Sequence, residues 1–432
     1  MSGRLRAALS CAAFLAISLF PGASFAQEAV ANGADTAWTL TASALVLFMT
    51  LPGLALFYGG LVQQKNVLSV MMQCVAIACV GSLLWLAIGY TLAFGPSLGV
   101  IGGLDKAFFP TALRGALVAT IPEPVFFVFQ MTFAVITPAL IVGAYVERIR
   151  FSAVVLFSAL WLLVVYAPVA HWLWGGGWLA KMGGLDFAGG LVVHATAGAS
   201  ALVVAKMLGA RDRFPSELHP PHAPGLTMVG AAMLWVGWYG FNGGSALTAS
   251  ADAGMAIMAT HISACAAGVV WAGIEWAKFG RPSMVGAVTG VIAGLATVTP
   301  ASGFVGPIGG LILGAAGAAV CFYAVQFVKQ VWKVDDSLDV FAVHGVGGVL
   351  GTLLLAVLMS DAFGGKGYAE GATMGSQLGV QALGVVAVVA WSAAASFALV
   401  HITKALVGLR AKDEHVREGL DLSAHGERAQ PD

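Results

Sequence analysis

Charged residues are scarce in this chain. Lys, Arg, Asp and Glu together make up 10% of its 432 residues, whereas a soluble domain carries about 25%. The 21 basic and 21 acidic side chains cancel, so the formal net charge is zero and nothing indicates a nucleic-acid partner. Hydrophobic residues make up 59% of the chain, and 56 residues are glycine. This composition excludes a soluble globular domain and predicts an all-helical polytopic membrane protein.

Cysteine is also rare, and its placement argues against cross-links. Of five cysteines, Cys11 lies in the N-terminal segment, and the other four sit singly in apolar runs: Cys74, Cys79, Cys265 and Cys321. Isolated cysteines in such runs are typical of packing residues. The sequence also presents no nucleophile–base pair and no set of metal ligands. We therefore expect no enzyme, no disulfide, no metal and no cofactor.

The first 26 residues have the features of a removable signal peptide. Arg4 and Arg6 give a basic start, an apolar run follows at residues 7–20, and residues 24–26 read Ser-Phe-Ala. Small residues at the two ends of that tripeptide are typical of a cleavage site. The alternative is a short first transmembrane helix.

Apolar stretches long enough to cross a hydrocarbon core of about 30 Å recur along residues 27–410. Short polar breaks separate eleven of them, centred near residues 48, 81, 135, 160, 199, 233, 264, 292, 316, 349 and 393. Gly286, Gly290 and Gly294 recur at four-residue spacing, which predicts close packing of that helix against a neighbour. We predict a transmembrane domain of eleven helices over residues 27–410 and a polar tail at residues 411–432.

Basic residues are distributed unevenly between the loops. One set of alternate loops, together with the tail, holds fifteen Lys and Arg, and the opposite loops hold four: Lys106, Arg114, Lys181 and Lys366. Cytoplasmic loops carry the excess of basic residues in membrane proteins. This asymmetry predicts a mature N-terminus outside and a cytoplasmic C-terminus, the orientation that a cleaved signal peptide also requires.

One pattern occurs twice, 150 residues apart. Asp186 is followed eight residues later by His194, and Asp336 by His344, with a glycine four residues after each histidine. The copies fall in the fifth and tenth predicted helices, so each repeat has five helices, the second is inverted, and the eleventh helix stands outside both. At about 1.5 Å per residue, each histidine lies about 12 Å from its own end of the membrane. Both histidines should therefore lie near the midplane.

A histidine within a membrane helix is costly to bury and usually faces a polar partner or a cavity. Taken singly, each histidine fits a hydrogen-bonded packing residue, but the repeated placement favours a functional pair. Neither a ring of acidic residues nor a carbonyl filter for metal cations is evident. Apolar walls with neutral imidazoles suit a weak base that sheds its proton before crossing, and ammonium is a small cation able to do so.

Seven runs carry a resemblance to a known family: LFYGGLVQQKN, GAYVERIRFSA, HWLWGGGWLA, DFAGGLVVH, GWYGFNGGS, VDDSLDVFAVHGVGG and EGLDLSAHGE. They extend over the mature chain and resemble the ammonium transporter family (Amt/Mep/Rh), on its bacterial Amt branch. The resemblance implies transport of ammonium or ammonia for nitrogen utilisation by a homotrimer in the lipid bilayer of the cell inner membrane. It also implies that the tail binds the nitrogen-regulatory PII protein, whereas polar composition alone indicates a disordered tail.

The same resemblance assigns an outer recruitment site for ammonium to Trp174, Phe133 and Ser245. Aromatic faces attract a cation by about 0.5–2 kcal/mol, and a serine oxygen accepts an ammonium N–H. Without the family, Trp174 fits a tryptophan of the membrane-interface belt. Phe133 and Phe241 match a stacked gate, although the pattern alone assigns both to the core.

The remaining site residues follow in the same way. Trp238 matches a pore-lining tryptophan, and His194 and His344 match a twin-histidine pair for proton transfer. Asp186 matches an acidic residue behind the recruitment site, for which a helix N-cap is the structural alternative. Asp336 is its supporting counterpart in the second repeat.

These roles imply capture of NH4+ outside, loss of its proton near the gate, and passage of NH3 past the imidazoles. A separate proton route gives net NH4+ uptake, and passive NH3 conduction stays open as an alternative. Two further functions compete: an Rh-type channel for NH3 or CO2, which the Trp174 motif argues against, and an ammonium sensor (transceptor) with little net flux. Such sensors often append a signalling domain, whereas this chain ends about two dozen residues after its last predicted helix.

Overall fold

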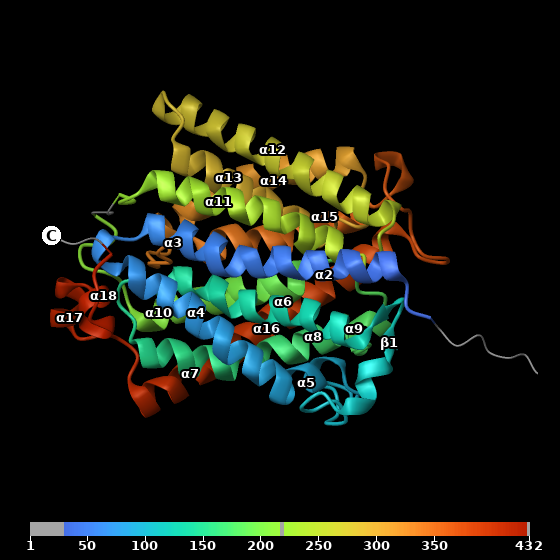
Figure 1. Cartoon of the computed structure of the whole chain (residues 1–432). Coiled ribbons are helices and arrows are strands. Elements are labelled where there is room, and N and C mark those ends of the chain that lie inside the picture. The colour runs from blue at the N-terminus through green and yellow to red at the C-terminus, as the bar shows by residue number, and fades with distance from the viewer. Residues whose placement is uncertain (1–29, 217–219, 430–432) are drawn as a thin grey trace, which may run out of the picture. The chain divides into compact units, whose positions relative to one another are not determined.

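The structure, a computed structural model, describes residues 30–216 and 220–429. The expected signal peptide at residues 1–26 lies outside the described residues. Within the described part of the chain, nine helices are long and apolar enough to cross a membrane, so the prediction of a helical membrane protein is confirmed. These helices run side by side within the unit that begins at Asn32 (Figure 1).

Five of the nine spans come from the first half of the chain. The first joins α2 (Gly33–Phe48), the π-helical η1 (Met49–Leu54) and α3 (Ala55–Leu61). The second joins η2 (Gln64–Asn66), α4 (Val67–Leu84), η3 (Trp85–Gly89) and α5 (Tyr90–Phe94), and the third is α6 (Glu123–Tyr145). The fourth joins α7 (Phe151–Trp161), η5 (Leu162–Tyr166), α8 (Ala167–Leu173) and α9 (Trp178–Lys181). The fifth joins η6 (Gly190–Ala195) and α10 (Thr196–Leu208).

The other four spans are α12 (Ala251–Phe279), α14 (Pro307–Gln326) with η8 (Phe327–Val331), η9 (Phe341–Gly345) with α15 (Val346–Leu358), and α16 (Met374–Val407). Two stretches that the sequence predicts to span the membrane are not among the nine. One is α11 (Pro224–Trp238) with η7 (Tyr239–Gly243), which is rich in glycine and aromatic residues. The other is α13 (Met284–Val298), which has 15 residues.

The bundle has two distinct ends, which Figure 1 shows on opposite sides. At one end β1 (Leu117–Val118) pairs antiparallel with β2 (Ile121–Pro122), and we call this the hairpin end. At the other end lie α17 (Asp413–Glu418) and α18 (Leu420–His425), and we call this the tail end. Short 3₁₀ turns, η4 (Thr111–Gly115) and η10 (Asp361–Phe363), lie in the connections before β1 and after α15.

Glycines set the distance between α12 and α13. A Cβ added to Gly290 would lie 2.4 Å from the Trp271 Cβ, and one added to Gly294 would lie 2.4 Å from the Ala267 Cβ. At Gly286 the added atom would overlap the Glu275 carboxylate. Helices approach this closely only where one of them lacks side chains. The close packing predicted from the four-residue glycine spacing is confirmed.

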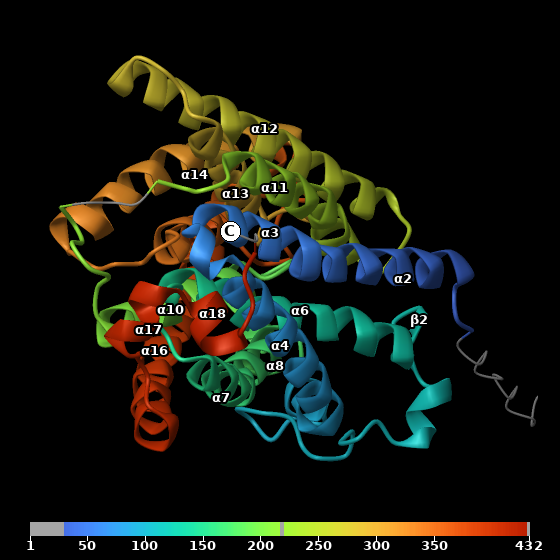
Figure 2. The same ribbon diagram turned by 60° about the vertical axis from the view of Figure 1, so that its left-hand side comes forward.

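The tail is folded against the start of α4 (Figures 1 and 2). The Asp421 carboxylate accepts a hydrogen bond from the Ser69 backbone N–H at 2.7 Å, and the Leu420 N–H donates to the Asn66 side chain at 2.9 Å. The Lys65 ammonium donates to the Arg417 carbonyl at 2.7 Å. Burial raises the pKa of the Asp421 carboxyl, and hydrogen bonds from the start of α4 oppose that shift. Asp421 therefore caps a helix some 350 residues away in sequence, and the disorder that polar composition indicates is not observed for residues 411–429.

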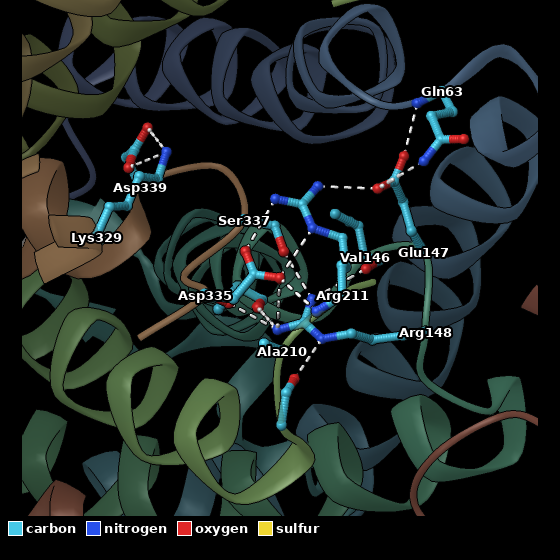
Figure 3. A network of polar contacts seen from close by, with 12 residues as sticks. Gln63, Val146, Glu147, Arg148, Ala210, Arg211, Lys329, Asp335, Ser337 and Asp339 are labelled. Atoms are coloured by element: carbon cyan, nitrogen blue, oxygen red, sulfur yellow. Dashed lines mark hydrogen bonds and ion pairs between the residues drawn. The ribbon is translucent and has the colours of Figure 1, made fainter. Parts of the chain in front are cut away.

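Buried charges gather at the tail end, where they are paired (Figure 3). Arg148 is fully buried and donates to four backbone carbonyls and to the Ser337 hydroxyl, and burial lowers its pKa to about 10. Arg211 binds both oxygens of the Asp335 carboxylate at 2.9 Å and one oxygen of Glu147 at 2.8 Å. Burial disfavours the charged form of Asp335, but the bonds and charge of Arg211 outweigh it and lower the pKa of that carboxyl. These contacts join the segments that follow α6, follow α10 and precede η9.

Candidate functional site

The structure brings the two predicted histidines into contact. His194 lies in η6, which begins from the hairpin end, and His344 lies in η9, which begins from the tail end. Their Nδ1 atoms are 3.3 Å apart, and their ring planes are inclined by 21°. Both side chains are buried, with 1% and 4% of their surface exposed.

Glycine allows the two histidine helices to touch through their backbones. A Cβ added to Gly198 would lie 2.2 Å from the Gly345 Cα, and one added to Gly348 would lie 2.6 Å from the Gly190 carbonyl oxygen. No real Cβ approaches another heavy atom so closely. The glycine four residues after each histidine in the repeated pattern is therefore the point at which one helix crosses the other.

An aspartate caps each histidine helix. The Asp186 carboxylate accepts backbone N–H bonds from four successive residues, 189–192, at 2.6–2.9 Å. Burial raises the pKa of Asp186, and these four donors oppose the shift. Asp336 accepts the Phe341 N–H at 2.7 Å, and burial together with the charge of nearby Asp339 raises its pKa to about 7. Both aspartates thus accept N–H groups at the start of a histidine helix from a position just before its N-cap residue, while a proton-handling role for Asp186 stays a prediction.

Because the two Nδ1 atoms face each other, they determine which ring nitrogens of the imidazole pair carry protons. In a neutral pair one Nδ1 donates and the other accepts, so one ring carries its proton on Nδ1 and the other on Nε2. The pair therefore presents one Nε2 acceptor and one Nε2 donor. The Nε2 atom of His194 is buried and has no hydrogen-bond partner among the described residues. It is available to a small polar solute in the cavity that both rings line.

Four aromatic rings lead from the hairpin end to this pair. Phe133 and Phe241 stack with ring centroids 4.3 Å apart, and each has 1% of its surface exposed. The Trp174 ring stands at 87° to the Phe133 ring, with centroids 5.7 Å apart. Trp238 lies nearly parallel to the His194 ring at 5.6 Å. The rings predicted for the recruitment site, the gate and the pore lining therefore form one continuous series.

Hydrogen bonds anchor Trp174, the outermost ring of this aromatic series, and Ser245 beside the gate. The Trp174 indole N–H donates to the Asp186 carbonyl at 2.8 Å, which ties the outermost ring to the start of the His194 helix. The Ser245 hydroxyl donates to the Phe241 carbonyl at 2.8 Å, so its oxygen keeps lone pairs for another donor. In this way Ser245 is tied to the gate.

Two positioning residues were missed by the sequence reasoning. Thr299 accepts the indole N–H of Trp238 at 2.9 Å and thereby orients that ring. His171 is buried and contacts the Ala93 carbonyl and the Ser97 hydroxyl, each at 2.9 Å, just before the Trp174 turn. His171 could have been found in the sequence only as a polar residue within an apolar run. Nothing in the sequence links Thr299 to Trp238.

A narrow cavity lies beyond the gate. Phe241, Trp238 and both histidines line it together with aliphatic side chains and Met49 and Phe57, and none of its described lining residues is charged. Its volume is about 10 Å³, which is room for about one water-sized molecule. On the tail side, His344 also borders a wider vestibule of about 320 Å³.

The crossed helices, the closed aromatic series and the uncharged cavity define a membrane transporter or channel for a small solute. The profile of the Ammonium Transporter Family matches residues 37–430. The chain is 43% identical to an ammonium transporter of Aquifex aeolicus, covering 96% of this chain and 97% of that one. It is also 43% identical to one of Bacillus subtilis, covering 92% and 98%. The chain belongs to the ammonium transporter family, and as a member it is a transporter or channel and not an enzyme.

Solved structures agree with this assignment. A protein described as a sensor Amt protein superposes with a TM-score of 0.85 at 31% identity, covering 91% of this chain and 98% of that one. The crystal structure of Saccharomyces cerevisiae Mep2 superposes with a TM-score of 0.82 at 34% identity, covering 89% and 88%.

The glycine contact between the histidine helices can be tested with Gly198→Ala. The added methyl group meets the backbone of Gly345, which cannot rotate away, so we expect a loss of stability of about 1–3 kcal/mol. The imidazoles should also separate, and ammonium flux should fall at least about tenfold. Thermal unfolding of the solubilised protein and flux into proteoliposomes measure the two effects.

Gly273→Ala is the matched control, because a Cβ at this position in α12 meets no atom within 4 Å. This control substitution should leave the unfolding temperature and the ammonium flux unchanged. Full stability and flux in Gly198→Ala would show that the backbone contact is dispensable.

Proposed function

We propose that the protein captures NH4+ at its outer face, removes a proton, and conducts NH3 through the cavity between the gate and the histidine pair. The observation that carries this proposal is the absence of charge among the described residues that line that cavity. Moving an unpaired ion into such a region costs many kcal/mol, whereas a neutral amine pays far less. The reaction is balanced by NH4+ separating into NH3 and a proton, which recombine on the far side.

The hairpin end is the proposed outer face. There the Trp174 and Phe133 rings meet nearly at right angles, and the Ser245 hydroxyl is bonded to the backbone carbonyl of Phe241. A cation against these rings gains about 0.5–2 kcal/mol, and the serine oxygen adds a hydrogen-bond acceptor. This arrangement favours capture of NH4+ over a gas channel, which needs no cation site.

The histidine pair is the proposed proton route. The Nδ1–Nδ1 contact of 3.3 Å lets a proton pass from one ring to the other, and both residues line the cavity through which the solute passes. Transfer along the pair moves charge without a cation in the pore. The product of the two paths is net NH4+ uptake.

The proposed architecture has eleven transmembrane helices, with α11–η7 and α13 added to the nine spans. Helices one to five and six to ten form inverted repeats, which the opposed capping of η6 and η9 supports. We further propose that residues 1–26 are a signal peptide, that residues 27–410 form the transmembrane domain, and that residues 411–432 face the cytoplasm. The protein then acts as a homotrimer in the cell inner membrane.

A sensor role is the second candidate function. It is favoured by the likeness to a structure described as a sensor Amt protein, at a TM-score of 0.85. Flux separates the two: a transporter carries ammonium in proteoliposomes without any partner, and a sensor binds it with little net movement.

Trp174→Leu should impair capture more than conduction. Loss of the aromatic face removes up to about 2 kcal/mol, so the half-saturation concentration for outside ammonium should rise by up to about thirtyfold. Flux at saturating ammonium should change less. Trp276→Leu on the exposed side of α12 is the control and should behave as the wild type. A collapse of saturating flux at unchanged half-saturation would instead assign Trp174 a purely structural role.

Substitution of the histidines tests the central step. His194→Leu combined with His344→Leu should keep the cavity dry and abolish proton-coupled ammonium current. Aspartate at either position should admit water and potassium, because a fixed negative charge favours cations. Ammonium and potassium currents of the variants measure these effects. Protein yield is the folding check, and His401→Leu on α16 is the control. Full ammonium current in the double leucine variant would exclude the histidines as the proton route.

The tail is the proposed contact for the PII protein. Its capping of α4 through Asp421 links it to the cytoplasmic end of a transmembrane helix. Deleting residues from Lys412 onward should lower flux or abolish PII binding while trimers still assemble. Native mass spectrometry measures trimer assembly, co-elution measures PII binding, and proteoliposomes measure ammonium flux. Unchanged flux together with unchanged PII binding would refute this role, and a monomeric full-length protein would refute the homotrimer.

A further inference from the structure

The tail-side vestibule has an ion pair in its wall. It is bordered by His344 on the pore side and holds about 320 Å³. Asp339 is the one acidic side chain among the described residues that line it, and Lys329 and Arg211 are its basic ones. Figure 3 shows Lys329 and Asp339 facing one another, apart from the cluster around Arg211.

The two basic residues are engaged differently. Arg211 is held by Asp335 and Glu147, which accept three hydrogen bonds from its guanidinium and one from its backbone N–H, all at 2.8–2.9 Å. The Lys329 ammonium group donates to Asp339 Oδ2 at 2.8 Å and lies 2.6 Å from Asp339 Oδ1. The Lys329 and Asp339 side chains are 15% and 20% exposed, and both line the vestibule, although Asp339 Oδ1 itself is buried.

The lysine head group is chemically an alkylammonium with three N–H donors. A carboxylate that binds it with both oxygens has the geometry to bind NH4+, which offers four such donors. We propose that Asp339 is an ammonium-binding site on the tail side of the pore and that Lys329 is its tethered competitor. This inference rests on the proposed function, because it assigns the site at which re-formed NH4+ leaves.

Competition from Lys329 lowers the affinity of Asp339 for ammonium. A lone carboxylate beside the pore would hold a cation and slow its release. A tethered ligand acts at an effective concentration on the order of millimolar, so free ammonium must compete with that concentration to occupy Asp339. The proposed outer site consists of neutral rings and a hydroxyl, and its contacts among the described residues include no tethered cation. The two faces should therefore differ in how strongly they respond to loss of the Lys329 charge.

Lys329→Met tests the inference in a planar bilayer with the protein in one orientation. The half-saturation concentration for ammonium added on the tail side should fall about three- to tenfold, and that for the hairpin side should stay unchanged. Adding Asp339→Asn in the same chain should abolish the shift. Lys333→Met is the matched control, because Lys333 is exposed just after η8, the helix that carries Lys329, and does not line the vestibule.

Three results would overturn the inference: no shift, an equal shift on both faces, or a shift that persists in the double variant. If Lys329→Met does not fold, Lys329→Gln removes the same charge with a polar side chain. Equilibrium binding of ¹⁵N-ammonium to the solubilised protein needs no transport. Tighter binding in Lys329→Met with no wild-type current would refute the proposed function but support this site, and equal binding in both proteins would refute the site.

Discussion

The backbone contact between the two histidine helices is the constraint on which the pore depends. Gly198 meets Gly345, and Gly348 meets the Gly190 carbonyl, at distances that leave no room for a side chain. Because the helices enter from opposite ends, this crossing brings together imidazoles that are 150 residues apart. The same crossing fixes where each capping aspartate lies, since Asp186 and Asp336 begin these helices. The aromatic series then has a defined end point against the His194 ring.

The cost of burying charge explains how polar groups are distributed around that crossing. At the tail end, where Arg148 is fully buried, its guanidinium is saturated by carbonyls and a hydroxyl, and Arg211 neutralises Asp335. Around the cavity only imidazoles and one indole N–H interrupt the apolar lining of the described residues. A buried ion without such partners is too costly, so the protein places its ions at the ends and a neutral pair between them. This distribution suits a solute that exists in both charged and neutral forms.

Much of the candidate site could be predicted from regular spacing and from family resemblance. The eight-residue interval from aspartate to histidine, repeated in an inverted unit, predicts two buried histidines near one another, and the spacing of Gly286, Gly290 and Gly294 predicts a close helix pair. Contacts between distant loops carry no such signal. Nothing in the sequence joins Lys329 to Asp339 in preference to Asp336, or Thr299 to Trp238, because tertiary packing decides these partners. Composition also misjudged the tail, whose order depends on specific bonds such as that from Ser69 to Asp421.

The claim that the pore passes ammonia and a separate proton, and not intact cations, is tested most directly by current recording on the wild-type protein in a planar bilayer. Ammonium and potassium have similar size and charge, so a simple sieve would pass both. With equal gradients of the two salts applied in turn, we expect a current under ammonium and none above the protein-free background under potassium. A potassium current comparable with the ammonium current would contradict the account.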